Sequence, residues 1–153
     1  EGVQILTIVA NKVDPDKQEE IRTQLTRSIS KDIIITIIPQ NKDLGNPTMK
    51  EIFESVGGKL LFGESQLSNP VDNSIVGAMQ LHNCLTRLGK NTLIVTPGDR
   101  GDIIIGALQA NLSKNYPKIA GIVLTGGLVP EPTIIKLIEG LDTVVPIISV
   151  QTG

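Results

Sequence analysis

The stretch TLIVTPGDRGDIIIGALQA occupies residues 92–110, and the related stretch IAGIVLTGG follows at residues 119–127. Each begins as a short aliphatic run that stops at a turn rich in Thr and Gly, and each turn opens a helix-like pattern. Runs without polar alternation are typical of parallel strands that helices cover on both faces. The stretch therefore predicts an α/β fold, in which ligands gather outside the carboxyl ends of the strands.

The same pattern of strand, turn and helix occurs three times in this part of the chain. The strands are expected at 74–78, 92–98 and 119–127, and the helices that follow them at 79–89, 99–112 and 130–140. A last strand is expected at 144–150. Strands that alternate with helices imply right-handed crossovers. We therefore expect a three-layer α/β/α fold with a mostly parallel sheet built from repeated strand-turn-helix units.

The chain before this region reads as one β-α-β unit. Strands are expected at 3–10 and 33–39, with a helix that Asp14 caps between them. One such unit buries its faces poorly, so we expect it to be the tail of a larger sheet. The polar segment 40–47 places a boundary near Gly45, which gives domains at residues 1–44 and 45–153. Thr48 and Glu51 have the spacing of a capping box at the start of the next helix.

Composition narrows the classes of function. The 153 residues include 2% aromatics and carry a net charge of −2, which argues against a nucleic-acid partner. The lone cysteine, Cys84, excludes an internal disulfide and a multi-cysteine metal site. No apolar run reaches the length of a membrane span and no signal peptide opens the sequence, so a cytoplasmic protein is expected.

The candidate binding residues follow the second and third strands of the repeat. They are Thr96, Gly98, Asp99, Arg100, Thr125, Gly126 and Gly127. Arg100 at a helix start would meet an anion with its guanidinium and the helix dipole together. Alternatively, Asp99 caps the helix and Arg100 pairs with Asp99 or Asp102. The Thr-Gly-Gly turn offers backbone N–H groups to a phosphate or carboxylate, or it is a tight turn that needs positive φ.

Other reactive side chains lack catalytic partners. His82 has no Asp, Ser or Cys at catalytic spacing, and Cys84 shares a face with leucines, as a core residue does. No triad, dyad, metal-ligand spacing or phosphate-binding loop occurs in the sequence. The residues therefore predict a binding or scaffolding module, with no cofactor and no metal.

The motifs TPGDRGD and LTGGLVPEP, with GAMQLHNCLTRL before them, resemble the DRTGG domain. That family is named for a D-R pair, here Asp99 and Arg100, and a T-G-G turn, here Thr125 to Gly127. Residues 1–44, with IVANKVD and IIITIIP, resemble the back half of a dethiobiotin-synthetase-like P-loop domain. In that resemblance Asn11, Lys12 and Asp14 correspond to the corner that recognises a nucleotide base.

This order of domains resembles the N-terminal regulatory region of long phosphate acetyltransferases. The resemblance implies that acetyl transfer belongs to a separate domain, and that this region responds to a metabolite and holds an oligomer together. We therefore expect a non-catalytic regulatory and oligomerisation module that forms a homo-oligomer and senses an anionic metabolite or nucleotide. The alternative is a small nucleotide-binding protein or enzyme that uses the loops at the strand ends.

Overall fold

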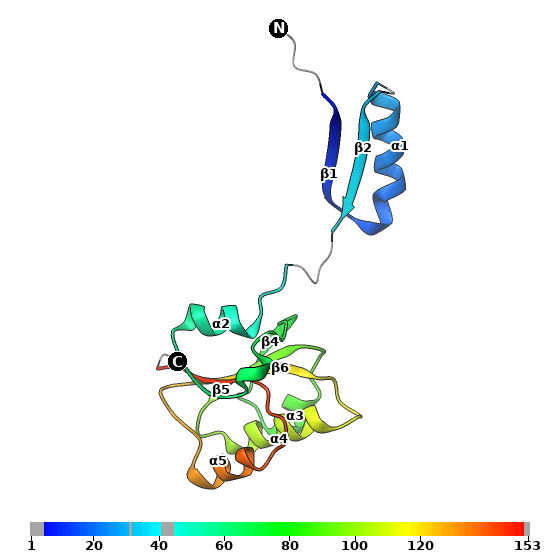
Figure 1. Ribbon diagram of the computed structural model, residues 1–153. Helices are drawn as coiled ribbons and strands as arrows, with labels where there is room; N and C mark the ends of the chain where they lie inside the picture. The colour runs from blue at the N-terminus through cyan, green and yellow to red at the C-terminus, as the bar shows by residue number, and fades with distance from the viewer. Residues whose placement is uncertain (1–4, 31, 41–44, 152–153) are drawn as a thin grey trace. The chain divides into compact units, whose positions relative to one another are not determined.

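The computed structural model describes residues 5–30, 32–40 and 45–151. It consists of two compact units, Glu1–Gly45 and Asn46–Gly153 (Figure 1). None of the helices in these described stretches is both long and apolar enough to cross a bilayer.

The smaller unit is the β-α-β unit that the sequence predicts. Its elements are β1 (Thr7–Val13), the 3-10 turn η1 (Pro15–Lys17), α1 (Gln18–Ser28) and β2 (Ile34–Pro39). The two strands pair in parallel, with Thr7 opposite Ile34. The first strand continues to Val13, beyond the predicted end at residue 10, because Asn11 still pairs with Ile38. Residues 3 and 4 of the predicted strand lie outside the described residues.

One face of this two-stranded sheet is open and includes exposed aliphatic side chains. Burial alternates along both strands, and α1 lies against β2 (Figure 1). The side chains of Val9, Ile34 and Ile38 are 52%, 67% and 45% exposed. The unit therefore leaves apolar surface uncovered, as predicted for a single β-α-β unit.

The larger unit contains a five-stranded sheet in the order β3-β7-β6-β5-β4. Its strands are β3 (Lys59–Phe62), β4 (Asn73–Val76), β5 (Thr92–Pro97), β6 (Ile119–Thr125) and β7 (Ile147–Ser149). The last four run in parallel, and only β3 runs antiparallel to its neighbour. The predicted mostly parallel sheet is confirmed.

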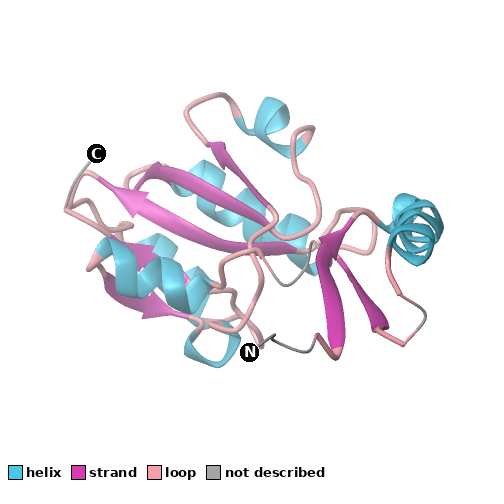
Figure 2. Ribbon diagram, turned by 90° about the horizontal axis from the view of Figure 1, so that it is seen from above, coloured by secondary structure: helices cyan, strands magenta, loops and turns pink. Residues whose placement is uncertain are grey.

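Helices cover this sheet on both faces (Figures 1 and 2). They are α2 (Met49–Val56), α3 (Leu81–Leu85), α4 (Gly101–Leu112) and α5 (Pro132–Glu139). Met49 of α2 packs with Leu93 and Val123 on one face of the sheet. On the other face, helices α3, α4 and α5 bury Cys84, Ile104 and Ile138 against the sheet. The larger unit thus has the predicted three layers, and its core is almost purely aliphatic.

Several predicted elements are longer than those observed. The helix expected at 79–89 is α-helical only over Leu81–Leu85. It continues as tighter turns, because the N–H groups of Arg87 and Leu88 donate to carbonyls three residues back. The last strand begins at Ile147 and not at residue 144, since Pro146 has no N–H to donate to the ladder.

Candidate functional site

The two candidate turns lie side by side at the carboxyl edge of the larger sheet. Strands β5 and β6 are parallel neighbours, and their last pair is Pro97 with Thr125. The segment after β5 and the segment after β6 are also in backbone contact. A Cβ atom at Gly98 would lie 2.0 Å from the carbonyl oxygen of Leu128. Only a glycine fits there, so the two turns form one packed structure.

Thr96 faces the interior. Its side chain is 1% exposed, and its hydroxyl donates to the carbonyl oxygen of Gly77 at 3.0 Å. This bond joins the end of β5 to the segment after β4. The single hydroxyl proton of Thr96 is therefore used within the fold.

The prediction that Asp99 caps the following helix is wrong. The N-cap of α4 is Arg100, and no side chain caps it. The reason is a tight turn before the helix, in which Arg100 N–H donates to Pro97 O at 3.1 Å and Gly101 N–H to Asp99 O at 3.0 Å. This turn places Asp99 one residue too early to cap, and its side chain is exposed.

Arg100 is engaged with groups of the chain itself. Its Nε and Nη2 atoms each donate to a carboxylate oxygen of Asp102 at 2.8 Å, in a bidentate pair. Nη1 also donates to Ala78 O at 3.3 Å, and Nη2 donates to Met79 O at 2.9 Å. These bonds use most of the five N–H groups of a guanidinium. Arg100 therefore joins the start of α4 to the loop between β4 and α3.

The pair of Arg100 with Asp102 explains how a cation is tolerated at a helix N-terminus. A positive charge there opposes the helix dipole, and an acidic residue in the first turn offsets it. The hydrogen bond from Arg100 lowers the pKa of Asp102, and the same bond raises the pKa of Arg100. Both groups stay charged at neutral pH. The Arg100 side chain remains 28% exposed.

The Thr-Gly-Gly turn has the backbone that its sequence predicts. Gly126 and Gly127 have φ angles of 78° and 67°, in the left-handed region that favours glycine. The N–H of Gly127 donates to Val150 O at 2.9 Å, which joins the turn to the chain after β7. Thr125 ends β6 and is half-buried, and Gly126 is exposed. At least one N–H of the turn is thus already used within the fold.

In the smaller unit, Asn11, Lys12 and Asp14 form a local turn. The side-chain oxygen of Asn11 accepts from Lys12 N–H at 2.9 Å, and Lys12 has a φ of 58°. Asp14 is the N-cap of η1, as predicted, and accepts from Asp16 N–H at 3.1 Å. All three residues are exposed.

The remaining reactive residues have the predicted surroundings. His82 is exposed on α3, and Cys84 is buried in the core. Burial raises the pKa of the Cys84 thiol, so the thiol stays protonated. Across the described residues, no three His, Cys, Asp or Glu side chains are grouped in a way that could hold a metal ion.

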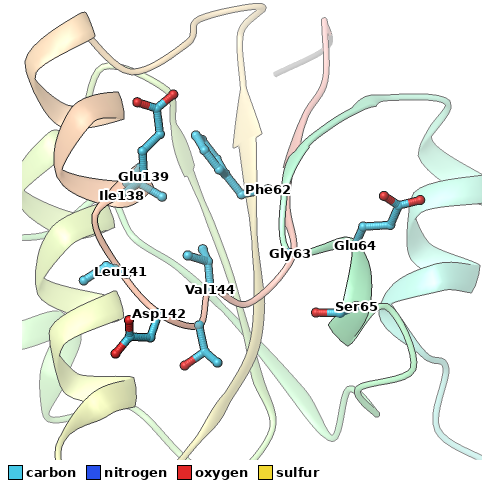
Figure 3. Close-up of a pocket in the computed structure, with 10 residues that line it drawn as sticks. Phe62, Gly63, Glu64, Ser65, Ile138, Glu139, Leu141, Asp142 and Val144 are labelled. Atoms are coloured by element: carbon cyan, nitrogen blue, oxygen red, sulfur yellow. The ribbon is translucent and has the colours of Figure 1, made fainter.

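A cavity lies at the other edge of the sheet, where the parallel strands begin. It measures about 670 Å³ and is lined by the end of β3, the turn after it, the end of α5 and the segment between α5 and β7. Figure 3 shows the Phe62 ring and the Ser65 hydroxyl within it, with Glu139 and Asp142 on the α5 side. The sequence interpretation missed this cavity because its residues share no motif and come from distant segments.

A mostly parallel sheet between helices, with two glycine turns packed together at its carboxyl edge, defines a three-layer α/β domain built around the DR and TGG motifs. The DRTGG domain family matches residues 51–153. The chain therefore belongs to the DRTGG domain family.

Relatives of the whole chain are much longer proteins. The chain is 42% identical over 154 residues to a protein named phosphate acetyltransferase from Synechocystis sp., a match that covers 99% of this chain and 22% of that protein. It is 38% identical to a phosphate acetyltransferase from Nitratidesulfovibrio vulgaris, with 98% of this chain and 22% of that protein covered. The chain thus spans about a fifth of the length of these relatives.

A solved structure has a similar fold. It contains the CBS and DRTGG domains of the regulatory region of a Clostridium perfringens pyrophosphatase, in complex with its activator diadenosine tetraphosphate. The TM-score is 0.54 at 14% identity, and the match covers 100% of this chain and 70% of that chain. The likeness supports the α/β fold of the chain.

Proposed function

We propose that the chain is a non-catalytic regulatory and oligomerisation module of a phosphate-acetyltransferase-like protein, and that it senses an anionic metabolite or nucleotide in the cytoplasm. The observation that carries this proposal is the DRTGG match over residues 51–153. The 42% identical relative named phosphate acetyltransferase supports the identity of the parent protein. The solved regulatory region bound to a dinucleotide activator supports an effector of that chemical class.

The smaller unit fits the same proposal. Its parallel strands and crossover helix are compatible with the back half of a P-loop domain. The exposed aliphatic side chains of its sheet would suit packing inside a larger domain. Asn11 and Asp14 use their side chains in a local turn, so a base contact by these residues would require the turn to rearrange.

We place the effector at the carboxyl edge of the larger sheet, over Arg100, Thr125 and Gly126. Arg100 is a cation at this edge, and its side chain is 28% exposed. Gly126 is exposed and Thr125 is half-buried, so both are reachable from solvent. Thr96, Gly98 and Gly127 would shape this edge from beneath, because their polar or backbone groups are packed within the fold. Exposed Asp99 would favour an effector that also carries a donor group.

Thermal unfolding with and without ligand tests the proposal. We expect at least one of ATP, NADH, phosphoenolpyruvate, acetyl phosphate or coenzyme A to raise the melting temperature, because ligands of the native state stabilise it. In Arg100→Lys that shift should shrink, since an ammonium cannot form the same fork with an anion. The control is Arg22→Lys, which changes an exposed arginine of α1.

Two results would contradict the proposal. One is an unchanged melting temperature with every ligand. The other is hydrolysis or transfer of a bound nucleotide by the purified chain, which would favour the alternative of a small nucleotide-binding enzyme.

A further inference from the structure

The two edges of the five-stranded sheet differ in how they are protected. An open strand edge presents unpaired N–H and C=O groups, and proteins block such edges with charges, prolines or bulges. The β3 edge has these features, because it begins with Lys59 and its pairing with β7 shifts register between Leu60 and Phe62. The β4 edge, Asn73–Val76, contains neither a charge nor a proline. It pairs with β5 without a register shift from end to end.

The β4 edge is also accessible. Asn73, Ser74 and Val76 are exposed, and the Val76 side chain is 62% exposed. β4 is the terminal strand, and β5 is its single neighbour among the strands of the described sheet (Figure 1). Gly77 N–H donates to Val95 O at 2.7 Å, and backbone direction alternates along a strand, so the N–H groups of Ser74 and Val76 point away from β5.

The strand is held in place before any partner arrives. Thr92 Oγ1 donates to the side chain of Asn73 at 2.6 Å, and Asp72 N–H donates to Asn91 O at 3.1 Å. Ile75 packs against the core on the α4 side. A preformed strand costs little conformational entropy to pair, so it is well suited to adding another strand.

We propose that the β4 edge is the surface through which two copies of this chain pair, antiparallel and about a two-fold axis. This rests on the oligomerisation that the proposed function includes, and it names the surface and the partner. An uncharged strand meets its own copy without like-charge repulsion, and a two-fold axis makes each hydrogen bond twice. Opposite residues of antiparallel strands share a face, so pairing centred on Ile75 sets Val76 opposite the partner's Ser74. The two sheets become one continuous sheet.

Sedimentation equilibrium of the full chain over a range of concentrations tests the pairing. Wild-type protein should show a species of twice the 16.4 kDa chain mass. In Val76→Lys the dimer dissociation constant should rise by about tenfold or more, because two lysines are brought to the same small interface. The matched control is Val56→Lys, the same change at a 43% exposed valine of α2, and it should leave the constant unchanged.

A second variant and a second measurement separate pairing from folding. Ser74→Pro removes an outward N–H and should weaken the dimer as Val76→Lys does. Amide hydrogen exchange at Ser74 and Val76 should slow as the wild-type concentration rises. A wild type that stays at the chain mass, or a Val76→Lys dimer as tight as the wild type with native circular dichroism, overturns the proposal. A monomeric wild type also overturns the oligomerisation in the proposed function, whereas an unchanged Val76→Lys dimer overturns the β4 surface alone.

Discussion

Arg100 illustrates what a single residue does at the carboxyl edge of the sheet. Its guanidinium bonds to Asp102 in its own helix and to two carbonyl groups 21 and 22 residues earlier in the chain. The sequence allowed us to predict a pair between Arg100 and Asp102 as one alternative. The contacts with Ala78 and Met79 could not be predicted, since they depend on how the loop after β4 folds back over α4.

The charge pair predicts how stability depends on pH. The pKa of Asp102 is lowered by its bond from Arg100, and the pKa of Glu51 by its bond from Thr48 N–H. A carboxyl group with a lowered folded pKa contributes stability above its unfolded pKa, near about 4, and loses it as pH falls through the folded value. The free energy of unfolding should therefore be flat between about pH 7 and 5 and fall below about pH 4.

Urea denaturation at a series of pH values checks this expectation. In Asp102→Asn the acid-side slope should be shallower, because that residue no longer takes up a proton on unfolding. The control is Asp142→Asn, at an exposed aspartate between α5 and β7. If Asp102→Asn has the same acid-side slope as the wild type, the loss of stability in acid is not due to Asp102.

Gly98 predicts a steric effect. In Gly98→Ala the new Cβ would lie 2.0 Å from the carbonyl oxygen of Leu128, which is backbone and cannot rotate away. Overpacking of this kind costs about 1–3 kcal/mol. The measurement is chemical denaturation, with Gly140→Ala as control. The nearest atom to a Cβ at Gly140 is 3.5 Å away, so this variant should be close to neutral. Equal stability of the two variants would disprove the close contact.

At the scale of elements, the capping signals of α2 predicted its ends correctly, whereas the one before α4 did not. Thr48 and Glu51 form the predicted capping box, and Gly57 ends α2 in the left-handed conformation with a φ of 61°. The start of α4 was misplaced because an Asp-Arg pair at a helix start suggests an Asp cap. The preceding Pro-Gly turn decides the actual cap, and its geometry depends on the contact of Gly98 with Leu128.

Helix α2 offers a direct measure of its cap. Thr48→Ala removes the hydroxyl that accepts from Glu51 N–H and donates to the Glu51 carboxylate, while the N–H of residue 48 can still donate to that carboxylate. Loss of such a cap costs about 0.5–2 kcal/mol. Thermal or urea unfolding should show this decrease, whereas Ser55→Ala, at an exposed site later in α2, should have a much smaller effect. Equal losses in the two variants would argue against the capping box.

At the scale of the whole molecule, the sequence predicted the fold class well and the cavities poorly. The aliphatic runs and the helical spacing of apolar residues show which side chains are buried. These patterns repeat along the chain, so they predict its strands and helices. The 670 Å³ cavity depends instead on how β3 turns antiparallel to β7 and brings Phe62 near Glu139. No local pattern encodes such a meeting of distant segments.

The proposed function predicts that the isolated chain does not transfer acetyl groups. Coenzyme A-dependent release of phosphate from acetyl phosphate should equal the buffer control, because the proposal assigns that reaction to a separate domain. A phosphate assay with a full-length phosphate acetyltransferase as positive control measures this. Release above the control would require a catalytic site in these 153 residues.

The bond between Gly127 and Val150 has a mechanical consequence. Val150 accepts from Gly127 N–H at 2.9 Å and donates its own N–H to Leu124 O at 2.8 Å, so it is fastened on both sides to β6 and its turn. A force applied to the chain at Gln151 is therefore carried straight into the Thr-Gly-Gly turn. Through the contact of Gly98 with Leu128, the same force reaches the start of α4. Backbone contacts thus connect the chain after β7, the Thr-Gly-Gly turn and the start of α4.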